Sequence, residues 1–184
     1  MCNLVLYMSM SLDGFVGGDR EHPGVAIPEG AELKQWKLDR ISQAGLHLMG
    51  RVTYQEMSSY WPRSDDPYAA PMNTIPKVVF SRTLTDAEAS WPVSTVARGD
   101  LATEIAAIKA EPGADAIVWG GGRLAGALAA ADLIDEYRLL VQPLVLGHGQ
   151  ALFDRLPDSR HLNLIEALPF PSGIVVHSYR AQRN

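Results

Sequence analysis

The sequence predicts an α/β protein whose sheet is mostly parallel, with helices on both faces and antiparallel strands at its carboxyl end. Short apolar runs alternate with helical stretches in the approximate order β α β α β β α β α β β β. Such alternation is typical of parallel strands joined by crossing helices. The last two apolar runs, 162–168 and 174–179, are separated by a short stretch that contains proline and glycine. This spacing indicates an antiparallel hairpin.

Composition limits the classes of function. The chain has 184 residues, of which 47% are hydrophobic and 20% charged, and we predict one domain over residues 1–184. A net charge of −5 argues against a broad nucleic-acid surface. The single cysteine, Cys2, excludes an internal disulfide and a cysteine-cluster zinc site, and we expect no metal site. No apolar run is long enough to span a membrane and no secretory leader is recognisable, so we expect a cytoplasmic protein without membrane partners.

The first strand, 4–10, is apolar except for Ser9 and is therefore expected in the centre of the sheet. A loop rich in turn residues follows it, in the position where α/β sheets commonly contact ligands. Asp13 in this loop is a candidate for proton transfer or hydrogen bonding. An aspartate before a glycine is also a frequent turn element, so both interpretations of Asp13 stay open.

A helix is predicted from residue 28 to about residue 44, with Gly45 as its cap. Glu32 lies near the first turn, where the helix dipole favours a carboxylate whether or not it has a function. The segment 60–73 contains three prolines and is predicted to be a loop. A long strand-like run, interrupted by Pro143, is predicted over 136–146.

Three junctions carry groups suited to phosphate. Strand 46–49 runs through Gly50 into a helix that begins with Arg51 and contains Thr53. Strand 76–80 ends in Ser81, Arg82 and Thr83. Arginine pairs with phosphate through two parallel N–H groups, and hydroxyl groups add hydrogen bonds.

The third junction joins strand 116–119 to a helix predicted over 123–131 through Gly120, Gly121 and Gly122. Glycines leave the backbone N–H groups at a helix start open to an anion such as a diphosphate. A tight turn without a ligand explains the same residues, and both interpretations stay open.

The order and spacing of these motifs resemble the dihydrofolate-reductase-like superfamily. The closer similarity is to the reductase domain of bacterial riboflavin biosynthesis proteins and its stand-alone relatives. The resemblance runs from residue 4 to residue 179 and also involves the segments 11–14 and 143–149. It implies a three-layer α/β/α sandwich on a mixed sheet, the cofactor NADPH, and a homodimer.

The resemblance also implies a cofactor site. The triple glycine would lie against the diphosphate, with a cis peptide bond between Gly120 and Gly121. Ser81 and Arg82 would hold the adenosine 2′-phosphate, and Ser9 and Val16 would flank the nicotinamide. The complete set of implied cofactor-binding residues is Ser9, Val16, Gly50, Arg51, Thr53, Ser81, Arg82, Thr83, Gly120, Gly121, Gly122, Arg123 and Leu124.

The expected reaction is hydride transfer from NADPH to a small substrate that is pterin-, pyrimidine- or carbonyl-like. Asp13 and Glu32 are the candidate catalytic residues: Asp13 matches the riboflavin-reductase pattern, and Glu32 corresponds to the helix carboxylate of dihydrofolate reductases. The chain lacks the zinc-deaminase half of the bifunctional riboflavin protein, so deamination is excluded. The alternative function is a module that binds NADPH or another ligand without turnover.

Overall fold

The computed structural model describes residues 2–16, 27–120 and 122–182. These residues form one sheet of eight strands with five α-helices and one short 3₁₀ helix. The strands are β1 Leu4–Ser11, β2 Leu46–Gly50, β3 Lys77–Phe80, β4 Ser94–Ala97, β5 Ala116–Trp119, β6 Glu136–Gln142, β7 Leu162–Pro169 and β8 Val175–Ala181. The helices are α1 Gly30–Ser42, α2 Arg51–Tyr60, η1 Trp61–Arg63, α3 Ala69–Thr74, α4 Leu101–Ala110 and α5 Gly122–Ala130.

The strand order across the sheet is β4-β3-β2-β5-β1-β6-β8-β7. All neighbours from β4 to β6 are parallel, whereas β8 is antiparallel to both β6 and β7. The predicted antiparallel carboxyl-terminal strands are therefore confirmed. Strand β7 lies at the edge of the sheet and carries an irregularity in register between Leu164 and Glu166.

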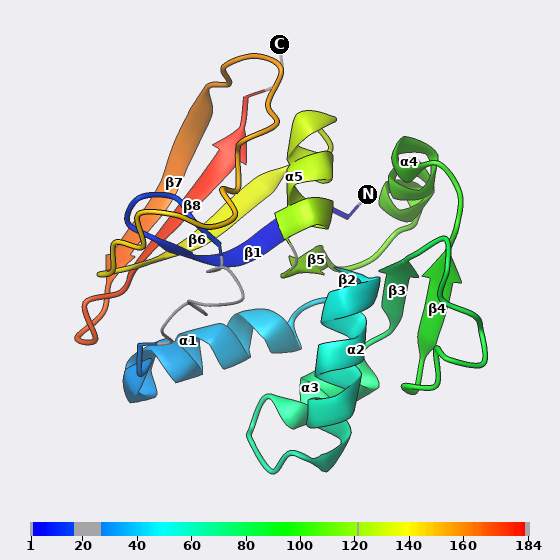
Figure 1. Ribbon diagram of the computed structural model, residues 1–184. Helices are drawn as coiled ribbons and strands as arrows, with labels where there is room; N and C mark the ends of the chain where they lie inside the picture. Colours follow the sequence, from blue (N-terminus) through cyan, green and yellow to red (C-terminus); the bar gives the residue numbers. More distant parts are fainter. Residues whose placement is uncertain (1, 17–26, 121, 183–184) are drawn as a thin grey trace.

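Helices cover both faces of this sheet, which makes a three-layer α/β/α sandwich (Figure 1). One core lies under α4 and α5 and includes Leu6, Ile105 and Leu128. The other lies under α1, α2 and α3 and includes Leu33 and Met72. Because successive strand residues point to opposite faces, β1 supplies both cores. The predicted fold class is confirmed.

The segment 60–73 differs from its prediction as a loop, because it contains η1 and α3. Proline is tolerated in the first turn of a helix, where its missing N–H would have no intrahelical partner. Pro62 and Pro71 both occupy such early positions. Asn73 ties the two helices together by donating from its side-chain amide to the Trp61 carbonyl at 3.0 Å.

Strand β6 ends at Gln142, four residues before the predicted end at residue 146. Pro143 follows it and lacks the N–H that a strand ladder requires. Helix α1 likewise begins at Gly30 and ends at Ser42, inside its predicted bounds of 28 and 44. Within the described residues, no helix combines the length and apolar character needed to cross a lipid bilayer.

Candidate active site

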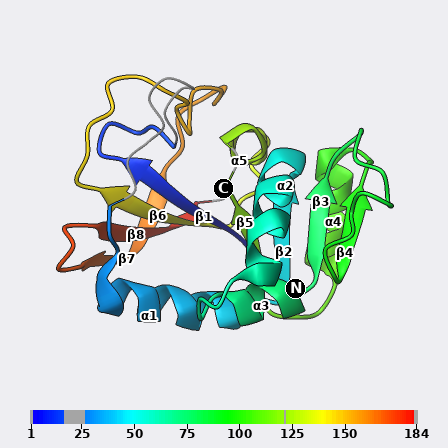
Figure 2. The ribbon, with the colours of Figure 1, turned by 60° about the horizontal axis from the view of Figure 1, so that its bottom comes forward.

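A cleft of about 1060 Å³ lies at the carboxyl ends of the parallel strands. It opens where the chain leaves β2 for α2 and the neighbouring β5 for α5, and these helices pack on opposite faces of the sheet (Figure 2). Such a divergence between adjacent strands is the usual ligand position in open α/β sheets. The lining continues along the ends of β3 and β4 to the start of α4.

The structure brings most of the expected cofactor residues together in this cleft. Those that line it are Gly50, Arg51, Thr53, Ser81, Arg82, Thr83, Gly122, Arg123 and Leu124. They come from three separate junctions in the sequence, and the parallel arrangement of β3, β2 and β5 places these junctions along one edge of the sheet. Gly121 lies outside the described residues, and so does its peptide bond to Gly120.

The start of α2 exposes its backbone to the cleft. Gly50 precedes α2 with extended backbone angles, φ −83° and ψ 166°, and no side chain caps the helix. A Cβ added at Gly50 would meet only the Leu124 Cβ, at 3.9 Å, so no protein atom crowds this position. The first N–H groups of a helix lack intrahelical partners and carry the positive end of its dipole. This end of the cleft therefore suits an anion.

The absence of a side chain at Gly120 is also required by the packing of the protein itself. Its φ of +45° lies in the left-handed region, where a side chain would be strained. A Cβ there would also lie 3.2 Å from the Thr53 Cγ2 and 3.4 Å from its Oγ1. Thr53 is buried. Because Gly120 has no side chain, Thr53 of α2 can pack against the backbone that leads into α5.

The charges that line the cleft are mostly positive. Arg82 and Arg123 have no hydrogen bond or ion pair with any described residue, whereas Arg51 donates to Gln55 at 3.3 Å. Asp100 is the one carboxylate among the described lining residues, and it accepts from the Thr103 backbone N–H at 3.0 Å. That hydrogen bond lowers the Asp100 pKa. The net positive charge of the cleft therefore favours an anionic ligand.

Arg98 also lines the cleft, although the motifs did not single it out. It follows β4 as Arg82 follows β3, and these two strands are adjacent and parallel. Applying the strand-end argument to β4 would have found it. Its guanidinium donates to the Leu84 carbonyl and to the Asp86 carboxylate, both at 2.9 Å.

The residues expected beside the nicotinamide, Ser9 and Val16, do not line the cleft. Ser9 is exposed although it belongs to the central strand β1, where it pairs with Leu140 of β6. Val16 is half-buried, and its backbone N–H donates to the Gln150 carbonyl at 2.9 Å. Since Gln150 lines the cleft, Val16 is linked to it through the backbone.

Asp13 is fully engaged in holding two loops together. Its carboxylate accepts from the Ser11 hydroxyl at 2.6 Å and from the backbone N–H groups of Leu146 at 3.1 Å and Gly147 at 2.7 Å. The Ser11 hydrogen bond contributes most, and with the backbone donors it lowers the Asp13 pKa to about 2. Asp13 is therefore ionised near neutral pH.

Glu32 lies in the first turn of α1 with an exposed side chain. It has no hydrogen bond or ion pair with any described residue, and it does not line the cleft. The structure does not bring Asp13 or Glu32 to the lining of the cleft.

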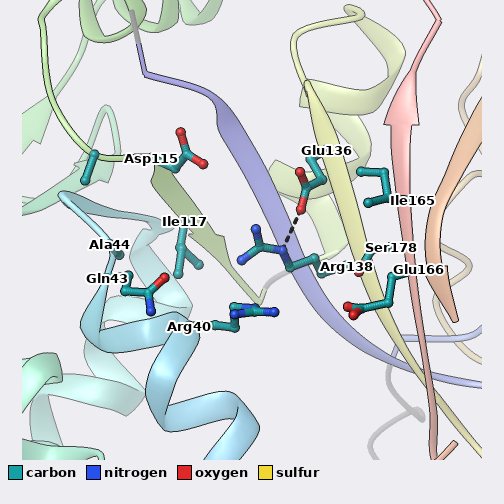
Figure 3. A pocket seen from close by; sticks show the side chains of 11 residues that line it. Arg40, Gln43, Ala44, Asp115, Ile117, Glu136, Arg138, Ile165, Glu166 and Ser178 are labelled. Carbon is teal, nitrogen blue, oxygen red and sulfur yellow. Dashed lines mark hydrogen bonds and ion pairs between the residues drawn. The ribbon is translucent and has the colours of Figure 1, made fainter. Parts of the chain in front are cut away.

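A second cavity, of about 540 Å³, lies at the amino ends of the parallel strands, between the end of α1 and the starts of β5 and β6. Figure 3 shows Arg138 and Glu136 pointing toward each other inside it, and their Nε and Oε1 atoms are 2.6 Å apart. None of the expected site residues lines this cavity. Across the described residues, no group of three or more His, Cys, Asp or Glu side chains is placed to hold a metal ion.

Comparisons with known proteins agree with this architecture. The family model of the RibD C-terminal domain matches residues 3–176. The uncharacterized protein YyaP of Bacillus subtilis (strain 168) is 27% identical over 177 residues, which cover 94% of this chain and 91% of YyaP.

Two solved structures extend the comparison. One, from Shewanella sp. PV-4, is provisionally assigned to riboflavin biosynthesis; it is 25% identical with a TM-score of 0.77, and the match covers all of both chains. A pyrimidine reductase-like protein from Corynebacterium diphtheriae is 15% identical with a TM-score of 0.71, covering 100% of this chain and 93% of that one. The match over nearly the whole sequence shows that this chain belongs to the RibD C-terminal domain family, a reductase-like family.

Proposed function

We propose that this protein is an NADPH-dependent oxidoreductase that transfers a hydride to a small pterin-, pyrimidine- or carbonyl-like substrate. The observation that carries the proposal is the cleft in which the starts of α2 and α5 and four arginines meet at the carboxyl ends of the parallel strands. Membership of a reductase-like family supports it independently.

The residues present fit a phosphorylated dinucleotide. Gly50 and the first turns of α2 and α5 offer backbone N–H groups for a diphosphate. Ser81, Arg82 and Thr83 stand further along the cleft, at the end of β3, and suit a second phosphate. A site with two separate anion-binding ends favours NADPH over NADH, because only NADPH carries the adenosine 2′-phosphate in addition to the diphosphate.

When bound, the reduced nicotinamide would supply a hydride, and the substrate would take up a proton to complete the reduction. The chain's own contribution is to bind the phosphates and orient the cofactor. We assign Asp13 a positioning role, because its ionised carboxylate holds the loop after β1 against residues 146–147. Glu32 is the proposed proton-transfer residue, since it is an exposed carboxylate without a hydrogen bond or ion pair to any described residue.

A second candidate, cofactor binding without turnover, is favoured by one observation. The described lining of the cleft contains a single carboxylate, Asp100, and that group is occupied as the cap of α4. A sensing module needs no proton donor, whereas a reductase obtains its proton from water or from a residue outside this lining.

Titration of the purified protein with NADPH and, separately, with NADH tests the proposal. We expect micromolar binding of NADPH and clearly weaker binding of NADH, measured by calorimetry. Absence of binding to both contradicts the proposal. Oxidation of bound NADPH in the presence of pterin, pyrimidine and carbonyl compounds then separates a reductase from a binding module.

A further inference from the structure

Gln150 covers the start of α5 from a distant loop. A Cβ added at Gly122, the first residue of α5, would lie 2.5 Å from the Gln150 Cδ and 2.6 Å from its Nε2. The side-chain amide of Gln150 therefore occupies the space that the glycine leaves free. Gln150 is itself exposed and lines the cleft.

The amide of Gln150 has unused hydrogen-bonding capacity. No described residue accepts from its Nε2 or donates to its Oε1. A carboxamide carries two N–H donors and an oxygen acceptor, so this group can bind a ligand without first breaking a hydrogen bond to any residue that the structure describes. It stands beside the exposed side chain of Arg123, at the end of the cleft formed by α2 and α5.

Backbone hydrogen bonds on and beside Gln150 hold its main chain in place. The Gln150 carbonyl accepts from the Val16 N–H at 2.9 Å, and the Leu152 N–H donates to the Gly14 carbonyl at 3.3 Å. Asp13 secures the other end of the same loop through the N–H groups at 146 and 147. The residue thus links the cleft to the loop after β1.

We propose that Gln150 is a cofactor-binding residue whose side-chain N–H groups donate to the diphosphate of the dinucleotide at the start of α5. This inference rests on the proposed function. A neutral donor strengthens an anion site without requiring a counter-ion, and hydrogen bonds to charged groups are the stronger ones. Arg82 and Arg98 lie at the other end of the cleft, so Gln150 should not influence the 2′-phosphate.

Gln150→Glu is the sharpest test, because it retains the size of the side chain but places a negative charge where the diphosphate binds. We expect NADPH affinity to fall more than about tenfold, and about tenfold in Gln150→Ala, which only removes the donors. The matched control is Gln43→Glu, which makes the same change at an exposed position lining the second cavity.

Adenosine 2′-monophosphate is the second probe, because it carries the 2′-phosphate but no diphosphate. Calorimetric competition should show unchanged affinity for it in Gln150→Glu. An NADPH affinity within twofold of the starting protein would overturn the role of Gln150, and so would equal losses for both probes. If the unmodified protein binds neither probe, the proposed function itself fails and this inference with it.

Discussion

Arg82 and Arg123 are cations in the cleft that no described carboxylate neutralises. Surface arginines of this kind are common, but here they line a cleft at the carboxyl ends of the strands rather than an open face. Their position, rather than their number, supports an anionic ligand. Single substitutions can therefore distinguish the contribution of one end of the cleft to ligand affinity from that of the other.

Arg82→Ala should weaken NADPH binding about tenfold or more and change NADH binding by less than about twofold. The reason is the loss of a charge-assisted contact to the 2′-phosphate, worth roughly 1.5–3 kcal/mol. Titration of both cofactors measures it. Arg63→Ala, which removes an exposed arginine away from the cleft, should leave both affinities unchanged. Equal weakening of the two cofactors would contradict the assignment of Arg82.

Asp13→Asn should destabilise the protein near neutral pH, with a difference in melting temperature that disappears in acid. The folded-state pKa of about 2 lies below the ordinary value of 3.8. The carboxylate therefore stabilises the folded state above about pH 4, and this contribution is lost as the pH falls through about 2. Thermal unfolding of both proteins across this range measures the difference.

The control for Asp13 is Asp158→Asn, which changes an exposed side chain without a hydrogen bond to any described residue. It should leave the melting temperature nearly constant. A pH-independent effect of Asp13→Asn would show that its carboxylate charge does not hold the loop.

At the scale of elements, a buried lysine stabilises the amino end of β3. Lys77 begins β3 and is 1% exposed. Its ammonium group donates to the carbonyls of Ile75 at 2.8 Å, Asn73 at 3.2 Å and Pro92 at 3.3 Å. It also lies 4.5 Å from the centre of the Trp91 ring. One buried lysine thus joins the end of α3 to the start of β3 and to the segment before β4.

Lys77→Met should lower the free energy of unfolding by about 1–3 kcal/mol, because it keeps the apolar stem but leaves buried carbonyls without a donor. Urea unfolding followed by circular dichroism measures the change. Lys34→Met, at an exposed position on α1, is the control and should have little effect. Unchanged stability in Lys77→Met would mean that water replaces the ammonium group.

At the scale of the whole molecule, the edge strand β7 is unusually apolar on its surface. Leu164 is 59% exposed and Ile165 is 46% exposed, and among the described strands β7 pairs only with β8. An exposed edge strand with apolar side chains is a template for pairing with another chain. We propose that it contributes to a homodimer.

The mass in solution should be twice the 20.0 kDa of the chain, as measured by light scattering. Leu164→Lys should shift the protein toward the monomer, because it places a charge on the pairing surface. Val145→Lys, at a 65% exposed position in a loop, should leave the mass unchanged. A monomeric starting protein would contradict the proposal.

The elements followed largely from local patterns in the sequence. The apolar runs of β1 and β5 and the turn residues between β7 and β8 act within short stretches of chain, so their effects can be read directly. The segment 60–73 differs from its prediction as a loop because proline is also tolerated in the first turn of a helix. Asn73 connects these helices to their surroundings by donating to the Trp61 carbonyl and accepting from the Trp91 indole N–H, and such contacts between distant residues are not visible in the local sequence.

By itself, the sequence determined the fold class, the antiparallel end of the sheet and the three phosphate-suited junctions. Only the tertiary structure decided the strand order. That order brings these junctions together in one cleft. The structure also showed that Gly120 admits Thr53, that Asp13 holds a loop, and that Gln150 covers Gly122. Local patterns depend on neighbouring residues, whereas these contacts join residues 28 to 134 positions apart whose proximity exists only after the sheet has formed.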